Sequence, residues 1–129
     1  MSHHHHHGSE VLHGLREPAR ALRAAIPDVY AGFSAMSAAA FTDDALDART
    51  KELIAIGIAV GQQCDGCIAS HARGAAKRGA TPEQVAEAIG VAIVIAGGPA
   101  TVYGPRAYAA FLEFHEQLAP RAGADGRDS

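Results

Sequence analysis

The chain contains no tryptophan, few other aromatic residues, only two cysteines and no excess of basic charge. A formal net charge of -3 without a basic stripe argues against nucleic acid as a partner. The apolar run at residues 53–60 is eight residues long, far short of the roughly 20 residues that a membrane-spanning helix needs. No stretch resembles a signal peptide. We therefore expect a cytoplasmic protein with no membrane partner.

The two ends of the sequence differ in character from the middle. Residues 1–9 include five consecutive histidines and are typical of an expression tag. Residues 10–119 have the length and composition of a single domain. Residues 120–129 are predicted to form a flexible tail.

Alanine is the most frequent residue, which favours closely packed helices. Thr42, followed by Asp43 and Asp44, is a candidate N-cap, and Thr81 begins a capping box with Gln84. The glycines and proline at 97–99 are expected to break the chain, and a last helix is expected to restart at 104–105. The predicted helices cover residues 10–25, 27–40, 43–61 and 64–78, a segment beginning after Thr81, and residues 104–118.

Residues 53–60 and 91–95 are rich in β-branched side chains and could instead be buried strands. The caps favour helices, because each candidate cap starts a segment that continues without a breaker into the apolar run. Helices that are apolar on nearly every face must be buried between other helices or against another subunit. A short, alanine-rich chain has a limited core of its own, so an oligomer is a reasonable expectation.

Both cysteines belong to one CxxC motif, Cys64 and Cys67, with His71 four residues further on. In a reducing compartment such a pair is more often redox-active or metal-binding than a structural crosslink. The alternative is two inert buried cysteines beside a surface histidine. A position at the start of a helix would favour the thiolate at both cysteines.

An antiparallel hairpin of the helices at 43–61 and 64–78 would bring Glu52 to the same motif. Glu52 would lie opposite position 73, which places His71 about 3 Å and Cys67 about 9 Å from its level. Glu52 could then orient or deprotonate His71, and His71 could take the proton of the Cys67 thiol, directly or through water. The alternative is an exposed Glu52 that pairs with Arg49 or a lysine.

The pattern Glu-x11-Cys-x2-Cys-x3-His resembles that of the AhpD-like alkylhydroperoxidases, within the carboxymuconolactone decarboxylase superfamily. The flanking segments 51–55, 71–84 and 97–100 resemble the same family, and the likeness covers roughly residues 25–118. It implies an all-α fold, AhpD-like, and a homotrimer or hexamer. In this family the best-studied members carry a histidine directly before the second cysteine, where this chain has Gly66.

The resemblance also implies a catalytic cycle and its partners. The site residues would be Glu52, Cys64, Cys67 and His71, with no cofactor and no bound metal. Cys67 would attack a hydroperoxide and become a sulfenic acid, and Cys64 would resolve it as a disulfide. A dithiol reductant, in some members a lipoyl group on a partner protein, would restore the thiols.

Four other functions remain open from the sequence. The first is a thiol-disulfide oxidoreductase with little peroxidase activity, and the second is a metal-binding module, although a second Cys or His pair is missing. The third is the lactone decarboxylation of the superfamily's namesake, whose members generally lack the CxxC, and the fourth is a non-catalytic interaction protein. Outside the motif, Tyr103, Arg106 and Tyr108 could line a pocket mouth, bind an anionic group or serve only in packing.

Overall fold

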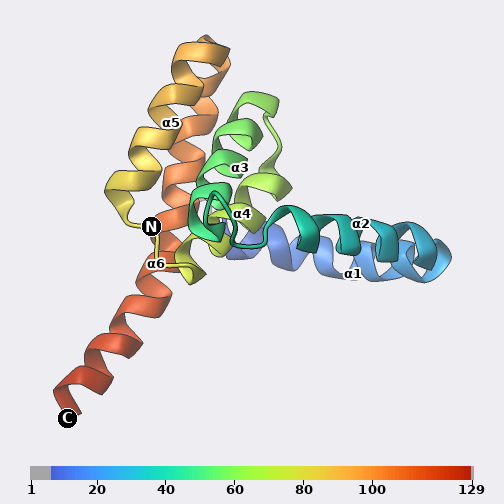
Figure 1. Ribbon diagram of the computed structural model, residues 1–129, viewed down its shortest axis with the longest axis horizontal. Coiled ribbons are helices and arrows are strands. Elements are labelled where there is room, and N and C mark those ends of the chain that lie inside the picture. Colours follow the sequence, from blue (N-terminus) through green and yellow to red (C-terminus); the bar gives the residue numbers. More distant parts are fainter. Residues whose placement is uncertain (1–6, 129) are drawn as a thin grey trace.

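The computed structural model describes residues 7–128, with side chains described up to residue 118, and this part of the chain contains helices and no strand. The all-α prediction is confirmed, and the apolar runs at 53–60 and 91–95 lie inside helices. Figure 1 shows a bundle of α3 to α6 from which α1 and α2 project as a hairpin. The helices are α1 (Ser9–Ala25), α2 (Pro27–Ala40), α3 (Ala48–Gln62), α4 (Asp65–Lys77), α5 (Pro82–Ala96) and α6 (Gly98–Asp128).

The start of α3 differs from the prediction. The N-cap is Asp47, whose side chain accepts a hydrogen bond from the backbone N–H of Thr50 at 2.8 Å. Thr42 instead directly follows the C-cap of the preceding helix, and its hydroxyl donates to the carbonyl of Ala38 in the last turn of that helix. Hydrogen bonds from the side chain and backbone of Thr50 lower the pKa of Asp47 below its ordinary value. An aspartate can accept from the N–H groups of a first turn as a threonine does, so the cap pattern alone did not distinguish the two positions.

The start of α5 agrees with the prediction. The hydroxyl of Thr81 accepts from the backbone N–H of Gln84 at 3.1 Å, and the side chain of Gln84 accepts from the backbone N–H of Thr81 at 3.0 Å. This reciprocal pair satisfies two N–H groups that would otherwise lack partners at the helix start. Pro82 occupies the first turn, where its missing N–H costs nothing.

The predicted restart at residues 104–105 is wrong. Gly97, with φ of 77°, ends α5, and α6 then runs from Gly98 through Gly104 and Pro105 without interruption. A Cβ at position 104 would lie 2.9 Å from a methyl group of Ile89, so this glycine allows α6 to pack closely on α5. Packing of α6 against both α4 and α5 therefore outweighs the local cost of a proline inside a helix.

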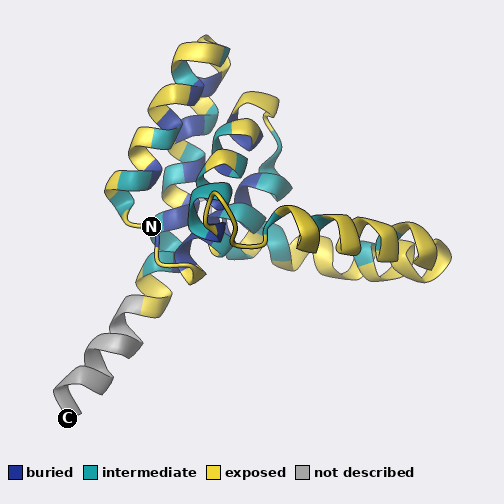
Figure 2. Cartoon of the chain, in the orientation of Figure 1, coloured by how far each residue is buried: buried dark blue, intermediate teal, exposed yellow. Residues whose placement is uncertain are grey.

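The core lies between α3, α4, α5 and α6, where the buried positions appear dark blue in Figure 2. Its largest fully buried side chains are Phe111, Ile56, Ile68, Val60 and Val85. Alanines fill much of the remaining contact, which lets the helices approach closely. Among the described residues, no helix is both long and apolar enough to cross a membrane.

The chain ends bear on two further predictions. Residues 1–6 of the expected tag lie outside the described part, whereas Gly8 is buried beside Phe114 and the hydroxyl of Ser9 donates to Glu113. The backbone of α6 is helical to Asp128. The side chains of the expected tail lie outside the described residues, so the tag and tail boundaries stay predictions.

Candidate active site

The CxxC motif lies at the turn between α3 and α4. Gln63 adopts a left-handed conformation, with φ of 58°, and the N–H of Cys64 donates to the carbonyl of Ala59 at 3.1 Å. This turn folds α4 back along α3, and the two helices pack on one another. The predicted antiparallel hairpin, with the motif at the N-terminus of its second helix, is confirmed.

Cys64 and Cys67 are joined as a disulfide, with their Cα atoms 5.2 Å apart. Cys64 is the N-cap of α4, and its sulfur accepts a hydrogen bond from the backbone N–H of Cys67 at 3.2 Å. The unpaired N–H groups of a helix start and the helix dipole both stabilise negative charge there. The structure therefore provides a stabilising environment for a thiolate at Cys64 in the reduced protein.

Among the residues whose side chains the structure describes, Glu52 is the one charged residue that is buried, with 6% of its surface exposed. Its carboxylate contacts Nδ1 of His71 at 2.8 Å and accepts from Nε of Arg78 at 3.4 Å. The alternative of an exposed Glu52 paired with Arg49 is wrong, since Arg49 contacts Asp47 at 3.8 Å instead. A buried carboxylate needs such partners, because an isolated one would carry a large desolvation cost.

Gly74 makes the Glu52 site possible. A Cβ at this position would lie within 3 Å of all three atoms of the Glu52 carboxylate group. Only a residue without a side chain leaves that volume to the carboxylate. Gly74 is one turn beyond His71 on α4, so the same helix face supplies both the imidazole and the space for its partner.

The ring of His71 is held on two sides. Glu52 fixes Nδ1, and Phe41, the C-cap of α2, stacks on the imidazole with ring centroids 5.3 Å apart. The side chain keeps 29% of its surface exposed, so the ring remains accessible to water or to a small reactant. Its other nitrogen, Nε2, is thereby left as the atom for proton exchange.

Asp65, between the two cysteines, has a neighbour that the sequence did not assign to it. Nη1 of Arg106 on α6 is 3.9 Å from Oδ1 of Asp65, and the same guanidinium lies over the ring of Tyr103, 4.5 Å from its centroid. Oδ1 of Asp65 is shielded from solvent and has no hydrogen-bond partner among the described residues. Arg106 therefore offsets the charge of a carboxylate that lies next to Cys64.

The four predicted site residues thus lie on one hairpin, although not all of them touch. His71 contacts Glu52, and Cys67 lies one helical turn before His71 on α4. Within residues 7–128 no direct hydrogen bond joins His71 to Cys67, whose sulfur is bonded to Cys64. Nor are three His, Cys, Asp or Glu side chains of this part arranged to hold a metal ion.

Sequence reasoning missed Arg78, Phe41 and the spatial role of Gly74. Arg78 was predictable in part, because it is the C-cap of α4, seven residues after His71, and so continues the same face of the helix. Phe41 was not, since it lies outside any helix in a segment whose path the sequence does not specify. Arg106 was a candidate for an anionic group, and Asp65 is the carboxylate that it meets in the structure.

Comparison with known proteins agrees with this fold. The sequence matches the profile of the carboxymuconolactone decarboxylase family over residues 27–112. It is 46% identical over 81 residues to uncharacterized protein 4 in the cox locus of Paracoccus denitrificans, covering 63% of this chain and 73% of the relative. It is 40% identical over 91 residues to an uncharacterized protein from Cupriavidus necator, covering 70% and 80%.

A solved structure gives the same result in three dimensions. The apo crystal structure of a carboxymuconolactone decarboxylase family protein from Legionella pneumophila has a TM-score of 0.80 to this chain, with 39% sequence identity. The match covers 83% of this chain and 96% of that one. The chain therefore belongs to the carboxymuconolactone decarboxylase family, and its CxxC motif is consistent with the AhpD-like part of that superfamily.

Proposed function

We propose that the protein is a thiol-dependent peroxidase that reduces alkyl hydroperoxides through a dithiol–disulfide cycle. The observation that carries the proposal is the contact of the buried Glu52 carboxylate with His71, which lies one helical turn from Cys67 on the helix that Cys64 caps. A carboxylate that orients an imidazole close to a thiol is an arrangement suited to activating that thiol. A stacked Phe41 and a glycine at 74 keep this pair in one geometry.

In the first step His71 takes the proton of the Cys67 thiol, and the thiolate attacks the distal oxygen of the hydroperoxide. The O–O bond breaks, Cys67 becomes a sulfenic acid, and the departing alkoxide receives the proton held by His71. In the second step the Cys64 thiol gives up its proton and the resulting thiolate attacks the Cys67 sulfur. The S–O bond breaks, and the departing hydroxide takes up that proton and leaves as water. The sum is one dithiol and one hydroperoxide converted to a disulfide, an alcohol and water.

The hydrogen bond at Cys64 supports its assignment to the second step. The N–H of Cys67 donates to the Cys64 sulfur, which favours a thiolate held close to the sulfur that it must attack. A small dithiol, such as a lipoyl group on a partner protein, would then reduce the disulfide by thiol exchange. We place this cycle in the cytoplasm and in a homotrimer or hexamer.

Two cysteine variants test the assignment of roles. After treatment with an organic hydroperoxide, Cys64→Ser should accumulate a sulfenic acid at Cys67 that dimedone traps and mass spectrometry locates. Cys67→Ser should form no dimedone adduct at a comparable rate. Fast labelling of Cys64 in Cys67→Ser, with none at Cys67 in Cys64→Ser, would reverse the assignment. No labelling of either variant would contradict peroxidase chemistry.

The second candidate is a thiol-disulfide oxidoreductase with little peroxidase activity, and Gly66 favours it. No imidazole precedes Cys67, and a Cβ at position 66 would lie 3.1 Å from a methyl group of Leu15 on α1. The proton relay therefore depends on Glu52 and His71 alone. Reduction of a model disulfide substrate by the reduced protein, with hydroperoxide turnover no faster than that of free cysteine, would favour this candidate.

A further inference from the structure

The hairpin of α1 and α2 has no buried side chain on either helix. Of the helices, α2 contacts only α1, and α1 is anchored at its base to α4 and α6. Figure 2 shows the result as an arm that is yellow over most of its length. Isolated helices gain little stability in water, because tertiary packing of an apolar face supplies most of it. Such an arm needs a surface to pack against.

The outer face of α2 is apolar. Val29, Phe33 and Met36 expose 64%, 62% and 62% of their surface. They follow the spacing i, i+4, i+7, so they form one stripe along the helix. This is the pattern of an amphipathic helix that places its anchors in a hydrophobic groove.

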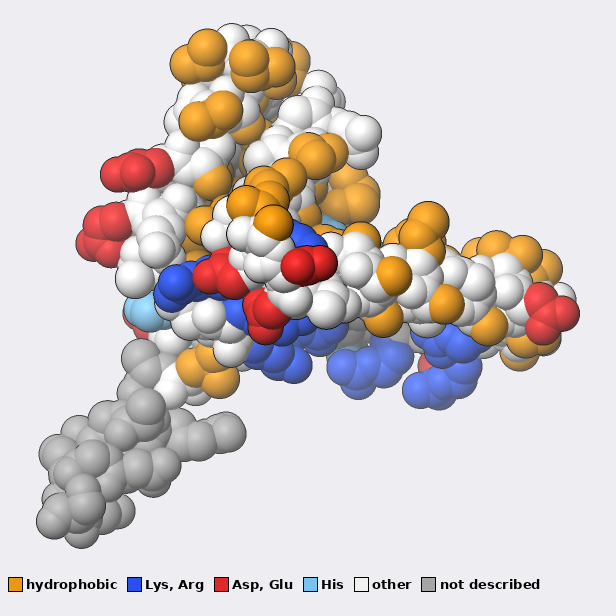
Figure 3. Space-filling view, viewed as in Figure 1, with side chains coloured by type: hydrophobic (Ala, Val, Ile, Leu, Met, Phe, Trp, Pro, Cys, Tyr) orange, Lys and Arg blue, Asp and Glu red, His pale blue; other side chains and the backbone are white. Residues whose placement is uncertain are grey.

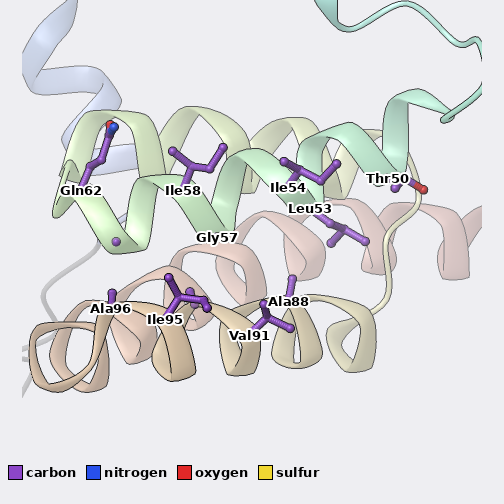
Figure 4. Close-up of a pocket in the computed structure, with 12 residues that line it drawn as sticks. Thr50, Leu53, Ile54, Gly57, Ile58, Gln62, Ala88, Val91, Ile95 and Ala96 are labelled. Carbon is purple, nitrogen blue, oxygen red and sulfur yellow. The ribbon is translucent and has the colours of Figure 1, made fainter.

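A groove of matching character lies between α3 and α5. Its volume is about 610 Å³ and its lining is almost entirely apolar. In Figure 4 the two helices run side by side, with Ile54 and Ile58 on α3 and Val91 and Ile95 on α5. All four are exposed, with Ile95 reaching 81%, and they contribute to the hydrophobic surface over these helices. An exposed apolar groove of this kind marks an interaction site.

The length of α2 and the charges beside it match the groove between α3 and α5. The three anchors of α2 span about 10 Å, and the α5 side of the groove, Ala88 to Ala96, spans about 12 Å. On α1, Arg16, Arg20 and Arg23 follow the same i, i+4, i+7 spacing and therefore share one face of the helix. Figure 3 shows basic side chains, in blue, along the lower side of the arm. The start of α5 presents two exposed carboxylates, Glu83 and Glu87.

The arm projects sideways from the bundle of α3 to α6 (Figure 1), and α2 does not contact α3 or α5 of its own chain. We propose that α2 of one copy lies in the α3–α5 groove of a second copy, with Val29, Phe33 and Met36 as its apolar anchors. The arginines of α1 then face Glu83 and Glu87 of the receiving copy. Each copy both donates an arm and receives one, so the contact closes as a two-fold pair or as a ring.

The arrangement also connects assembly to the candidate site. Phe41 caps α2 and stacks on His71, so a partner that seats α2 also holds the ring that covers the imidazole. The proposal does not depend on peroxidase chemistry, because its test measures mass and not activity. A result that contradicts the arm-in-groove contact would leave the proposed peroxidase function unaffected, and the reverse also holds.

The test uses one variant on each side of the contact. Phe33→Glu damages the arm, and Ile58→Glu damages the groove. Each variant should raise the dissociation constant of self-association, measured by sedimentation velocity, by at least about 100-fold. The reason is that burying an unpaired carboxylate costs more free energy than the apolar contact contributes. Ala31→Glu, on the opposite face of α2, is the matched control and should leave assembly unchanged. Circular dichroism should show the same helix content in all three variants.

Mixing the two defective variants gives the sharper result. Ile58→Glu keeps an intact arm and Phe33→Glu keeps an intact groove, so a 1:1 mixture should form a heterodimer although each variant alone does not. Failure of the mixture to associate would overturn the proposal. A wild-type protein that remains monomeric at all concentrations would overturn it too, as would equal loss of assembly in Ala31→Glu.

Discussion

Replacing Glu52 by glutamine isolates the charge of the buried carboxylate from its shape. The amide has nearly the same volume and keeps one oxygen to accept the bond from Nδ1 of His71, now 2.8 Å long. Glutamine removes the negative charge that stabilises the imidazolium formed when His71 takes the thiol proton. We therefore expect a folded protein whose thiol reacts more slowly with hydroperoxide.

The size of the effect follows from the distance between the two charges. Charge centres about 4 Å apart interact by about 4 kcal/mol at an effective dielectric constant of about 20. Partial exposure of His71, at 29%, screens part of this. We expect about 2.7 kcal/mol to be lost from the transition state, which corresponds to about 100-fold in rate. This lies at the lower end of the range found for general acid–base catalysis.

Stopped-flow mixing of reduced protein with an organic hydroperoxide measures this rate as loss of free thiol. Glu116→Gln, at an exposed site on α6, is the matched control and should react like wild type. Arg78 is 43% exposed, so its guanidinium can rehydrate and the melting temperature of Glu52→Gln should change by only a few degrees. A Glu52→Gln protein that folds normally and reacts within about twofold of wild type would refute the relay.

Three further predictions concern the surroundings of the site. Gly74→Ala should lower both the melting temperature and the thiol reaction rate, because the new Cβ would occupy the space of the Glu52 carboxylate. Gly90→Ala is the control: it has open space at its Cβ position and should stabilise α5 by about 0.5–1 kcal/mol. Equal melting temperatures for the two variants would contradict this prediction. Arg106→Gln should leave the Asp65 carboxylate without its partner, which should slow alkylation of the reduced thiols by up to about fivefold and lower the reduction potential of the CxxC disulfide by about 10 mV. Adding Asp65→Asn to this variant should restore the alkylation rate and the reduction potential. A double variant whose thiols react still more slowly would contradict the prediction. Asp47→Asn should be less stable than wild type mainly above pH 3.8. The lowered pKa of Asp47 contributes stability that is present above the ordinary pKa and is lost as the pH falls through the pKa of the folded protein. In thermal melts from pH 2 to 7, the melting temperatures of wild type and variant should therefore converge in acid, and their divergence in acid would contradict the prediction.

The parts of the fold that the sequence predicted are those with a local physical cause. The capping box at Thr81 and the glycine at 97 set boundaries that neighbouring residues alone determine. The hairpin and the meeting of Glu52 with His71 followed from helix geometry once α3 and α4 were placed. The number of residues in the turn between α3 and α4 determines which residues of the two helices lie opposite one another.

The errors arose where distant packing decides the outcome. Gly104 and Pro105 favour a break locally, but contact of α6 with Ile89 and with α4 keeps the helix continuous. Thr42 and Asp47 are both residue types that can cap a helix. The path of residues 41–47 across the bundle determines that α3 begins after Asp47. Likewise, the position of Phe41 over His71 depends on the three-dimensional course of that segment and not on any periodicity.

The most direct test of the peroxidase account is a stoichiometric titration of the fully reduced protein with a limiting organic hydroperoxide. One equivalent should consume both thiols, yield one intramolecular Cys64–Cys67 disulfide by intact mass, and release one equivalent of the alcohol. The reaction should be much faster than that of free cysteine under the same conditions. A rate equal to that of free cysteine, or oxidation that leaves the two thiols unpaired, would contradict the account.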